Sequence, residues 1–96
     1  MFDLTITNEV NELLRQVRKE LRNKGYKESK RRINRHIGTI HLSFIIEYFI
    51  KGNLVFEIER DLTRIERDLT RSVIITRLHY KGEHKEIRLA DILSLA

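Results

Sequence analysis

The chain of 96 residues contains no cysteine, so disulfide bonds, thiol chemistry and cysteine-based zinc sites are excluded. Hydrophobic residues make up 41% of the chain and charged residues 34%, a balance typical of one folded domain (1–96) and not of a disordered chain. The net charge of +5 is local, because 15–36 hold ten of the nineteen Lys and Arg residues and only two of the fourteen acidic residues. Such a cluster is typical of surfaces that meet phosphate-rich partners.

The first predicted helix spans 8–23. Residues 2–6 alternate between apolar and polar, which predicts either a short strand or the lead-in to this helix. Thr7 or Asn8 can cap its first turn, and apolar residues then recur at helical spacing. We expect Gly25 to end the helix in the left-handed conformation.

A second, strongly basic helix is predicted over 27–37, ended by Gly38. Ile33 and Ile37 form its small apolar face, and Lys and Arg occupy most other positions. Like charges at neighbouring helical positions repel one another. We therefore expect this helix to become fully ordered only when a polyanion neutralises it.

After Gly38 the apolar residues recur at every second position, which indicates β-strands. The turn signal at 51–53 separates two such runs and predicts a β-hairpin. A three-residue loop in this hairpin would place Tyr48 opposite Phe56 and Glu47 opposite Glu57.

A perfect seven-residue repeat, IERDLTR, occupies 58–64 and again 65–71. In a strand, an odd insertion sends every later side chain to the wrong face, whereas seven residues nearly preserve the face of a helix. We therefore predict a helix over 60–71. A recently duplicated loop is the alternative.

A second hairpin is predicted from strands 73–80 and 86–89, followed by a brief helix over 90–95. The order is then α-α-ββ-α-ββ-α, an α+β fold in which two N-terminal helices pack on an antiparallel sheet of about four strands. This single domain has a basic helical part (8–37) and a β-hairpin and helix part (39–96). The exposed sheet edges of so small a chain lead us to expect a homodimer.

The leading hypothesis for function is a small non-enzymatic nucleic-acid-binding protein, a regulator that contacts phosphates of DNA or RNA through 15–36. We expect no cofactor. The residues expected to bind nucleic acid are Arg15, Arg18, Lys19, Arg22, Lys24, Lys27, Lys30, Arg31, Arg32 and Arg35.

Other readings of the same residues stay open. The cations can dock an acidic protein partner, pair with the acidic residues of the repeat, or form a solvated surface. A third function class is a metal-dependent nuclease, in which Glu47, Glu57 and Glu59 hold a divalent ion beside the basic helices. The alternative is that these acidic residues face solvent or pair with arginines such as Arg60 or Arg77. The four histidines are scattered, and we expect no metal site from them.

The sequence also bears on localisation. The N-terminal residues lack the basic and then apolar pattern of a secretion signal. The most apolar run, 40–50, is short and contains Glu47, so we expect a buried strand there and no membrane association. The expected location is cytoplasmic, as an intracellular soluble protein.

Overall fold

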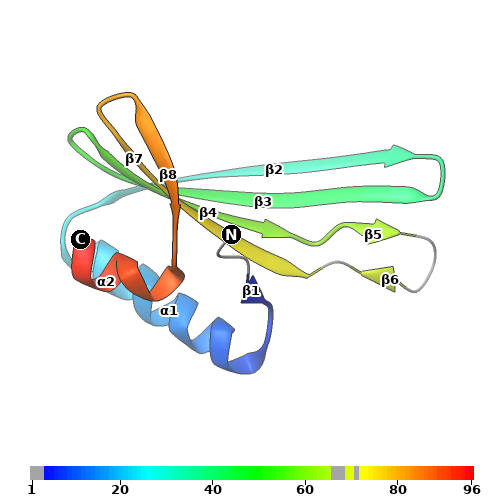
Figure 1. Ribbon diagram of the computed structural model, residues 1–96, viewed down its shortest axis with the longest axis horizontal. Coiled ribbons are helices and arrows are strands. Elements are labelled where there is room, and N and C mark those ends of the chain that lie inside the picture. The colour runs from blue at the N-terminus through cyan, green and yellow to red at the C-terminus, as the bar shows by residue number, and fades with distance from the viewer. Residues whose placement is uncertain (1–3, 66–68, 71) are drawn as a thin grey trace.

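The structure is a computed structural model that describes residues 4–65, 69–70 and 72–96. A layer of helices lies against one face of a twisted antiparallel sheet (Figure 1). Within the described residues the sheet has eight strands. The elements are β1 (Leu4–Thr5), α1 (Asn8–Asn23), β2 (Lys27–Ile37), β3 (Ile40–Lys51), β4 (Leu54–Asp61), β5 (Arg64–Ile65), β6 (Leu69–Thr70), β7 (Val73–Tyr80), β8 (Glu83–Ile87), the 3-10 helix η1 (Leu89–Asp91) and α2 (Ile92–Leu95).

Helix α1 forms where the sequence predicts it. The Thr7 side chain accepts a hydrogen bond from the backbone N–H of Val10 at 3.2 Å, which caps the first turn. Leu14, Val17 and Leu21 recur at helical spacing and are buried against the sheet. Burial of this apolar stripe is what fixes the helix on the sheet.

The end of α1 is also as predicted. Gly25 has a φ of +87°, and its N–H donates to the carbonyl oxygen of Arg22 at 3.1 Å. The N–H of Tyr26 donates to the carbonyl oxygen of Leu21 at 3.0 Å. This pair of bonds is the Schellman arrangement, which a glycine in the left-handed region permits, and it turns the chain from the helix into β2.

The predicted second helix over 27–37 is wrong, because these residues form the eleven-residue strand β2. Every residue of β2 pairs with β3, from Lys27 opposite Ile50 to Ile37 opposite Ile40. A two-residue turn that begins at Gly38, with a φ of +59°, joins the two strands. In a strand, cations four residues apart are about 13 Å from one another, whereas in a helix the rise between them is about 6 Å. The extended conformation therefore relieves the repulsion that a helix would impose.

The β3–β4 hairpin is present, but its register differs by one residue from the predicted one. The turn has two residues, because Lys51 pairs directly with Leu54. Phe49 therefore lies opposite Phe56, and Glu47 lies opposite Ile58 instead of Glu57. The change moves the side chain of Glu47 to the opposite face of the sheet from Glu57.

The predicted helix over the tandem repeat is wrong. The first copy continues β4 into β5, and the described part of the second copy includes β6. Strand β5 pairs with β6 in the same register in which β4 pairs with β7. The seven extra residues of the repeat do not turn the side chains of β7 to the wrong face of the sheet. They are shared between the two strands of one long hairpin, and the pairing of β4 with β7 fixes which face each side chain takes. Residues 66–68 and 71 lie outside the described part of the chain.

A β7–β8 hairpin and a helical C-terminal segment are present as predicted, but the second strand is not at 86–89. Strand β8 begins at Glu83, because the turn has two residues and Tyr80 pairs directly with Glu83. The predicted arrangement of two N-terminal helices on about four strands is nevertheless wrong: the structure has one N-terminal helix on a larger sheet. None of the helices in the described ranges has the length and apolar character that crossing a membrane requires.

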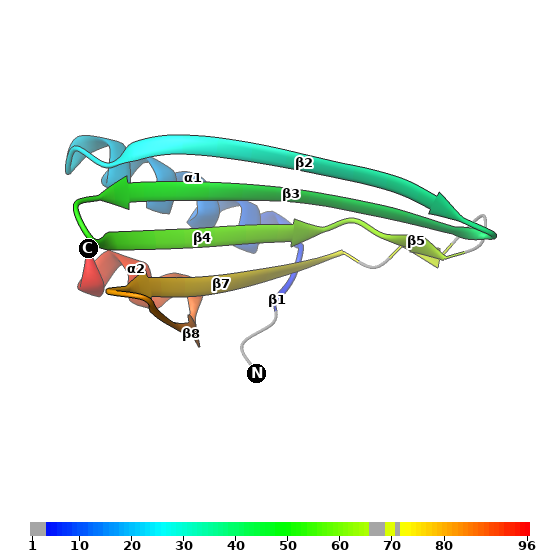
Figure 2. The same ribbon diagram turned by 90° about the horizontal axis from the view of Figure 1, so that it is seen from above.

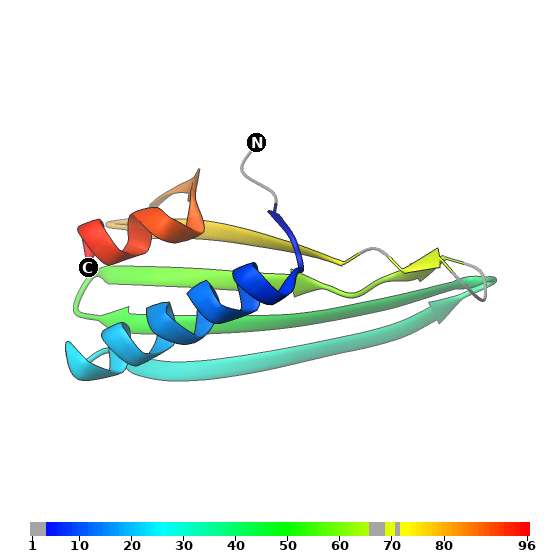
Figure 3. The same ribbon diagram turned by 90° about the horizontal axis from the view of Figure 1, so that it is seen from below.

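The two faces of the sheet differ in how they are covered. We call the face with Glu47, Phe49, Phe56 and Ile58 the helix face, because α1 and α2 lie over it (Figure 3). The opposite face, which carries Ile46 and its neighbours, has no helix over it and is called the open face (Figure 2). Strands β2 and β3 extend well beyond α1, and we call this extension the distal end of the sheet (Figure 3).

Candidate nucleic-acid interface

The ten cations predicted to bind nucleic acid fall into two groups of five. One group belongs to α1 and the residue that follows it, namely Arg15, Arg18, Lys19, Arg22 and Lys24. The other group lies on β2, namely Lys27, Lys30, Arg31, Arg32 and Arg35. The sequence predicts two adjacent basic helices for these cations, whereas in the structure they lie on one helix and one strand.

Most cations of the helix group form ion pairs with acidic residues of the same chain. The Nε of Arg22 donates to the carboxylate of Glu28 at 2.8 Å, and Arg15 pairs with Glu12 in the same helix. The Nζ of Lys24 lies 4.0 Å from the carboxylate of Glu20. Such exposed pairs are weak, but they lower the charge that the helix presents to an external anion.

Arg18 is the most firmly held of this group. Its Nε and Nη2 atoms donate to the two carboxylate oxygens of Glu47, at 2.8 and 2.6 Å. The Nη2 of Arg60 on β4 lies 3.2 Å from the same carboxylate. The Arg18 side chain is 22% exposed and that of Glu47 only 9%, so this fork joins α1 to the sheet in a largely dehydrated site.

The charge of Glu47 depends on these cations. Burial would raise the pKa of Glu47, but the hydrogen bonds from Arg18 and the charges of Arg18, Arg60 and Lys30 outweigh it and lower the pKa below its ordinary value. Glu47 is therefore an ionised structural carboxylate. The pairing of these carboxylates with Arg60 or Arg77, which the sequence offers as the alternative to a metal site, is confirmed for Arg60 and Glu47. Arg18 is the partner of Glu47 that the sequence does not indicate, because it lies 29 residues away on another element.

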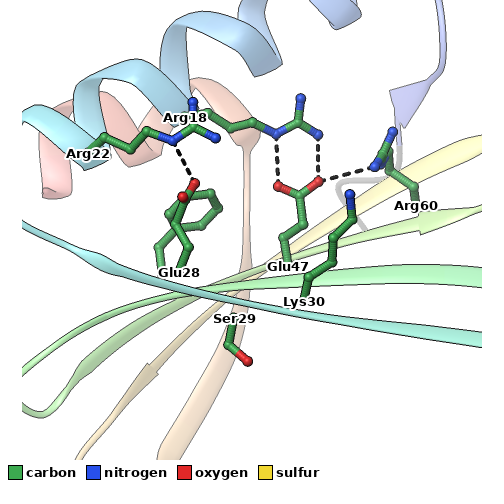
Figure 4. A pocket seen from close by; sticks show the side chains of 8 residues that line it. Arg18, Arg22, Glu28, Ser29, Lys30, Glu47 and Arg60 are labelled. Atoms are coloured by element: carbon green, nitrogen blue, oxygen red, sulfur yellow. Dashed lines mark hydrogen bonds and ion pairs between the residues drawn. The ribbon is translucent and has the colours of Figure 1, made fainter.

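A cleft of about 330 Å³ opens between α1 and strands β2, β3 and β4 beside this fork (Figure 4). Its charged lining consists of Arg18, Arg22, Lys30 and Arg60 against Glu28 and Glu47. The cations outnumber the carboxylates, so the cleft favours anions. Lys30 lies opposite Glu47 and belongs both to this lining and to β2.

The β2 cations are in a different situation. All five are exposed, and among the described residues none of them forms an ion pair. The stretch 30–46 contains four Lys and Arg residues and no acidic residue. In the described sheet β2 pairs only with β3, so its other edge is free. The arrangement exposes a row of cations along one edge of the protein.

The residues of β2 alternate between the two faces. Lys30 and Arg32 lie on the helix face, and Lys27, Arg31 and Arg35 lie on the open face. The distal end adds the exposed Arg64, which lies opposite His41 in the sheet. The His36 and His41 rings stack there with centroids 4.2 Å apart. Planar rings and cations gathered in this way suit contacts with phosphates and bases.

The three carboxylates of the nuclease hypothesis are not brought together. Glu47 lies on the helix face, whereas Glu57 and Glu59 lie on the open face. Nη1 of Arg77 lies 2.5 Å from Glu57 and 3.7 Å from Glu59. The predicted register that opposed Glu47 to Glu57 is what made the cluster plausible, and that register is wrong.

No protein-family model, curated protein or solved structure matches this chain. Its own residues are therefore what a function can be inferred from.

Proposed function

We propose that this protein is a non-enzymatic nucleic-acid-binding protein that contacts the phosphate backbone along the free edge of β2. The observation that supports the proposal is the separation of the two cation groups. The helix cations are mostly held by neighbouring carboxylates. In contrast, Lys30, Arg32 and Arg35 are exposed along the edge strand β2, and the stretch 30–46 contains no acidic residue.

The geometry of an edge strand suits a linear polyanion. From Lys30 to Arg35 the strand advances about 17 Å. Side chains from both faces border the same edge, so a phosphate backbone that runs along it meets cations on each side. Each neutralised phosphate releases counterions, which makes the binding strongly dependent on salt. The cationic cleft beside Lys30 continues this surface toward α1.

The test compares two double variants that change the net charge equally. Arg32→Glu with Arg35→Glu alters the β2 row, and Arg15→Glu with Lys19→Glu alters exposed positions on α1. Binding to single- and double-stranded DNA and RNA is measured by fluorescence anisotropy over a series of salt concentrations. We expect the β2 variant to lose more than about tenfold in affinity and to show a shallower salt dependence. We expect a much smaller loss for the helix variant.

Equal losses in the two variants would show that overall charge matters and the position does not, and would contradict the proposal. Unchanged affinity in the β2 variant would contradict it more directly. Binding of an acidic polypeptide such as poly-glutamate in preference to every oligonucleotide would favour the other candidate, an acidic protein partner. That candidate uses the same cations, so only the choice of ligand separates the two.

A further inference from the structure

The open face of the sheet is apolar along its middle strand. Every second residue of β3 points to this face, and these residues are Ile40, Leu42, Phe44, Ile46, Tyr48 and Ile50. Ile50 is 38% exposed, and next to the turn Ile37 and Ile40 are 60% and 36% exposed. Figure 2 shows no helix over this face. Between these ends, Leu42, Phe44, Ile46 and Tyr48 are partly exposed, and the row as a whole is an apolar stripe that no helix of the described chain covers.

Charges of opposite sign border this apolar row. On one side, β2 contributes Lys27, Arg31 and Arg35 to the open face. On the other side, β4 contributes Glu57 and Glu59. The register places Arg31 beside Ile46 and Ile46 beside Glu59, so that cation, apolar residue and anion form one line across the three strands.

Among the described residues, two basic side chains lie beside the acidic side. Nη1 of Arg77 lies 2.5 Å from Glu57 and 3.7 Å from Glu59, and Nε2 of His79 lies 3.3 Å from Glu57. Burial raises the pKa of Glu59, and the charges of Glu57 and Asp61 raise it further against the opposing pull of Arg77. A second cation near Glu59 would therefore stabilise its ionised form.

We propose that a second copy of this chain covers the open face, packed face to face with its two-fold axis parallel to β3. This axis places β2 of one protomer over β4 of its partner, and Arg31 then meets the partner's Glu59. A two-fold axis across the strands would instead stack β2 on β2 and bring cations together. Ile46 lies close to the proposed axis and packs against the partner's Ile46.

The size of the overlapping face agrees with a specific interface. Roughly sixteen side chains of β2, β3 and β4 point to it, and each covers about 32 Å² of a sheet with ordinary strand spacing. Two copies would bury about 1,000 Å², which is the size at which specific protein interfaces begin. Face-to-face sheets of this kind pack about 10 Å apart.

The dimer leaves free the part of the β2 row that lies on the helix face, so the dimer and the proposed function can fail separately. Lys30 and Arg32 lie on the helix face, which the dimer leaves uncovered. Arg35 lies opposite Leu42, beyond the paired end of β4 at Asp61, so it faces no carboxylate of β4 across the interface. Failure of the dimer would leave the β2 row intact.

The experiment uses two charge reversals and their mixture. Arg31→Glu in both protomers faces Glu59 with another carboxylate, and Glu59→Arg faces Arg31 with another cation. In a mixture of the two variants, both cross-interface pairs are attractive again. Arg31 and Glu59 of one chain are separated by β3, so a purely intramolecular effect cannot produce this rescue.

Mass is measured by light scattering after size-exclusion chromatography and by sedimentation at micromolar concentration. We expect the wild type to be a dimer, each single variant to be a monomer that retains its circular dichroism spectrum, and the mixture to form a heterodimer. A variant that loses its fold is replaced by Arg31→Gln or Glu59→Gln, which should weaken the dimer at least several-fold. A monomeric wild type, dimeric single variants, or a mixture that stays monomeric would overturn the proposal.

Discussion

The guanidinium of Arg18 on α1 holds the carboxylate of Glu47 on β3 through two hydrogen bonds, and this pair connects the helix layer to the sheet at a buried point. Arg60 approaches the same carboxylate from β4. One acidic residue therefore neutralises cations from two elements that are far apart in the sequence.

Replacing Glu47 by Gln should lower the free energy of unfolding by about 2–3 kcal/mol at neutral pH. The change leaves Arg18 and Arg60 without their anion in a poorly hydrated site. Chemical denaturation monitored by circular dichroism measures the loss. Glu28→Gln, in the exposed pair with Arg22, is the matched control and should change stability by less than about 0.5 kcal/mol. Equal losses of stability in the two variants would contradict the stabilising role of the Arg18–Glu47 pair.

The same carboxylate predicts how stability depends on pH. The pKa of Glu47 is lower in the folded protein than its ordinary value, so the folded state binds this proton more weakly than the unfolded state does. Its contribution is complete above the ordinary pKa of 4.5 and is lost as the pH falls through the lower, folded value. Acid unfolding of Glu47→Gln should therefore be less steep than that of the wild type, as measured by thermal melts at successive pH values. Curves that stay parallel would show that Glu47 does not titrate as described.

Replacing Gly25 by Ala should destabilise the protein by about 1–2 kcal/mol. The cost is conformational, because φ is +87° and a Cβ at this position would have no heavy atom within 4 Å. The control is Lys24→Ala at the preceding position, where φ is −84° and no such strain arises. Thermal melts of the two variants should separate by several degrees. A Gly25→Ala protein as stable as the control would contradict the capping role.

Arg32 alone should account for a measurable part of the salt dependence of the proposed nucleic-acid binding. Replacing Arg32 by Gln should reduce the slope of log K against log[salt] by about 1, equally for all sequences tested. Arg18→Gln should leave the slope almost unchanged, because Arg18 is already held by Glu47. A slope that changes with Arg18 and not with Arg32 would place the interface on the helix.

The proposed dimer should weaken as the solution becomes acidic. The pKa of Glu59 in the single chain is raised by burial, and a cation from the partner would lower it again, so dimerisation releases a proton. The dimer dissociation constant should therefore increase as the pH falls through the raised pKa, which lies above the ordinary 4.5. Sedimentation at a series of pH values measures this. The Glu59→Gln variant should form a weaker dimer with no such dependence over that range.

Local signals in the sequence were sufficient where one residue fixes the backbone. Thr7 and Gly25 delimit α1 in the structure as they do in the sequence. The β7–β8 hairpin likewise follows from its Lys81-Gly82 turn, where both residues have positive φ.

Local sequence signals do not predict the secondary structure correctly where pairing with a distant strand decides it. Ile33 and Ile37 are four apart, a spacing that fits one face of a helix and also one face of a strand. Only the long partner β3 makes the strand the better choice. The same limit applies to the site. The basic character of 15–36 is visible in the sequence, but which of its cations are held by carboxylates depends on residues such as Glu47, which is distant in the sequence.

Arg31 and Arg32 are neighbours in the sequence, yet they project from opposite faces of β2, so the two proposals give them different roles. The tight turn that begins at Gly38 fixes which arginine lies on which face. A shift of β2 by one position would exchange the two arginines between the faces. An insertion that lengthens this turn by one residue should therefore impair both proposed contacts together, although no charged side chain is altered.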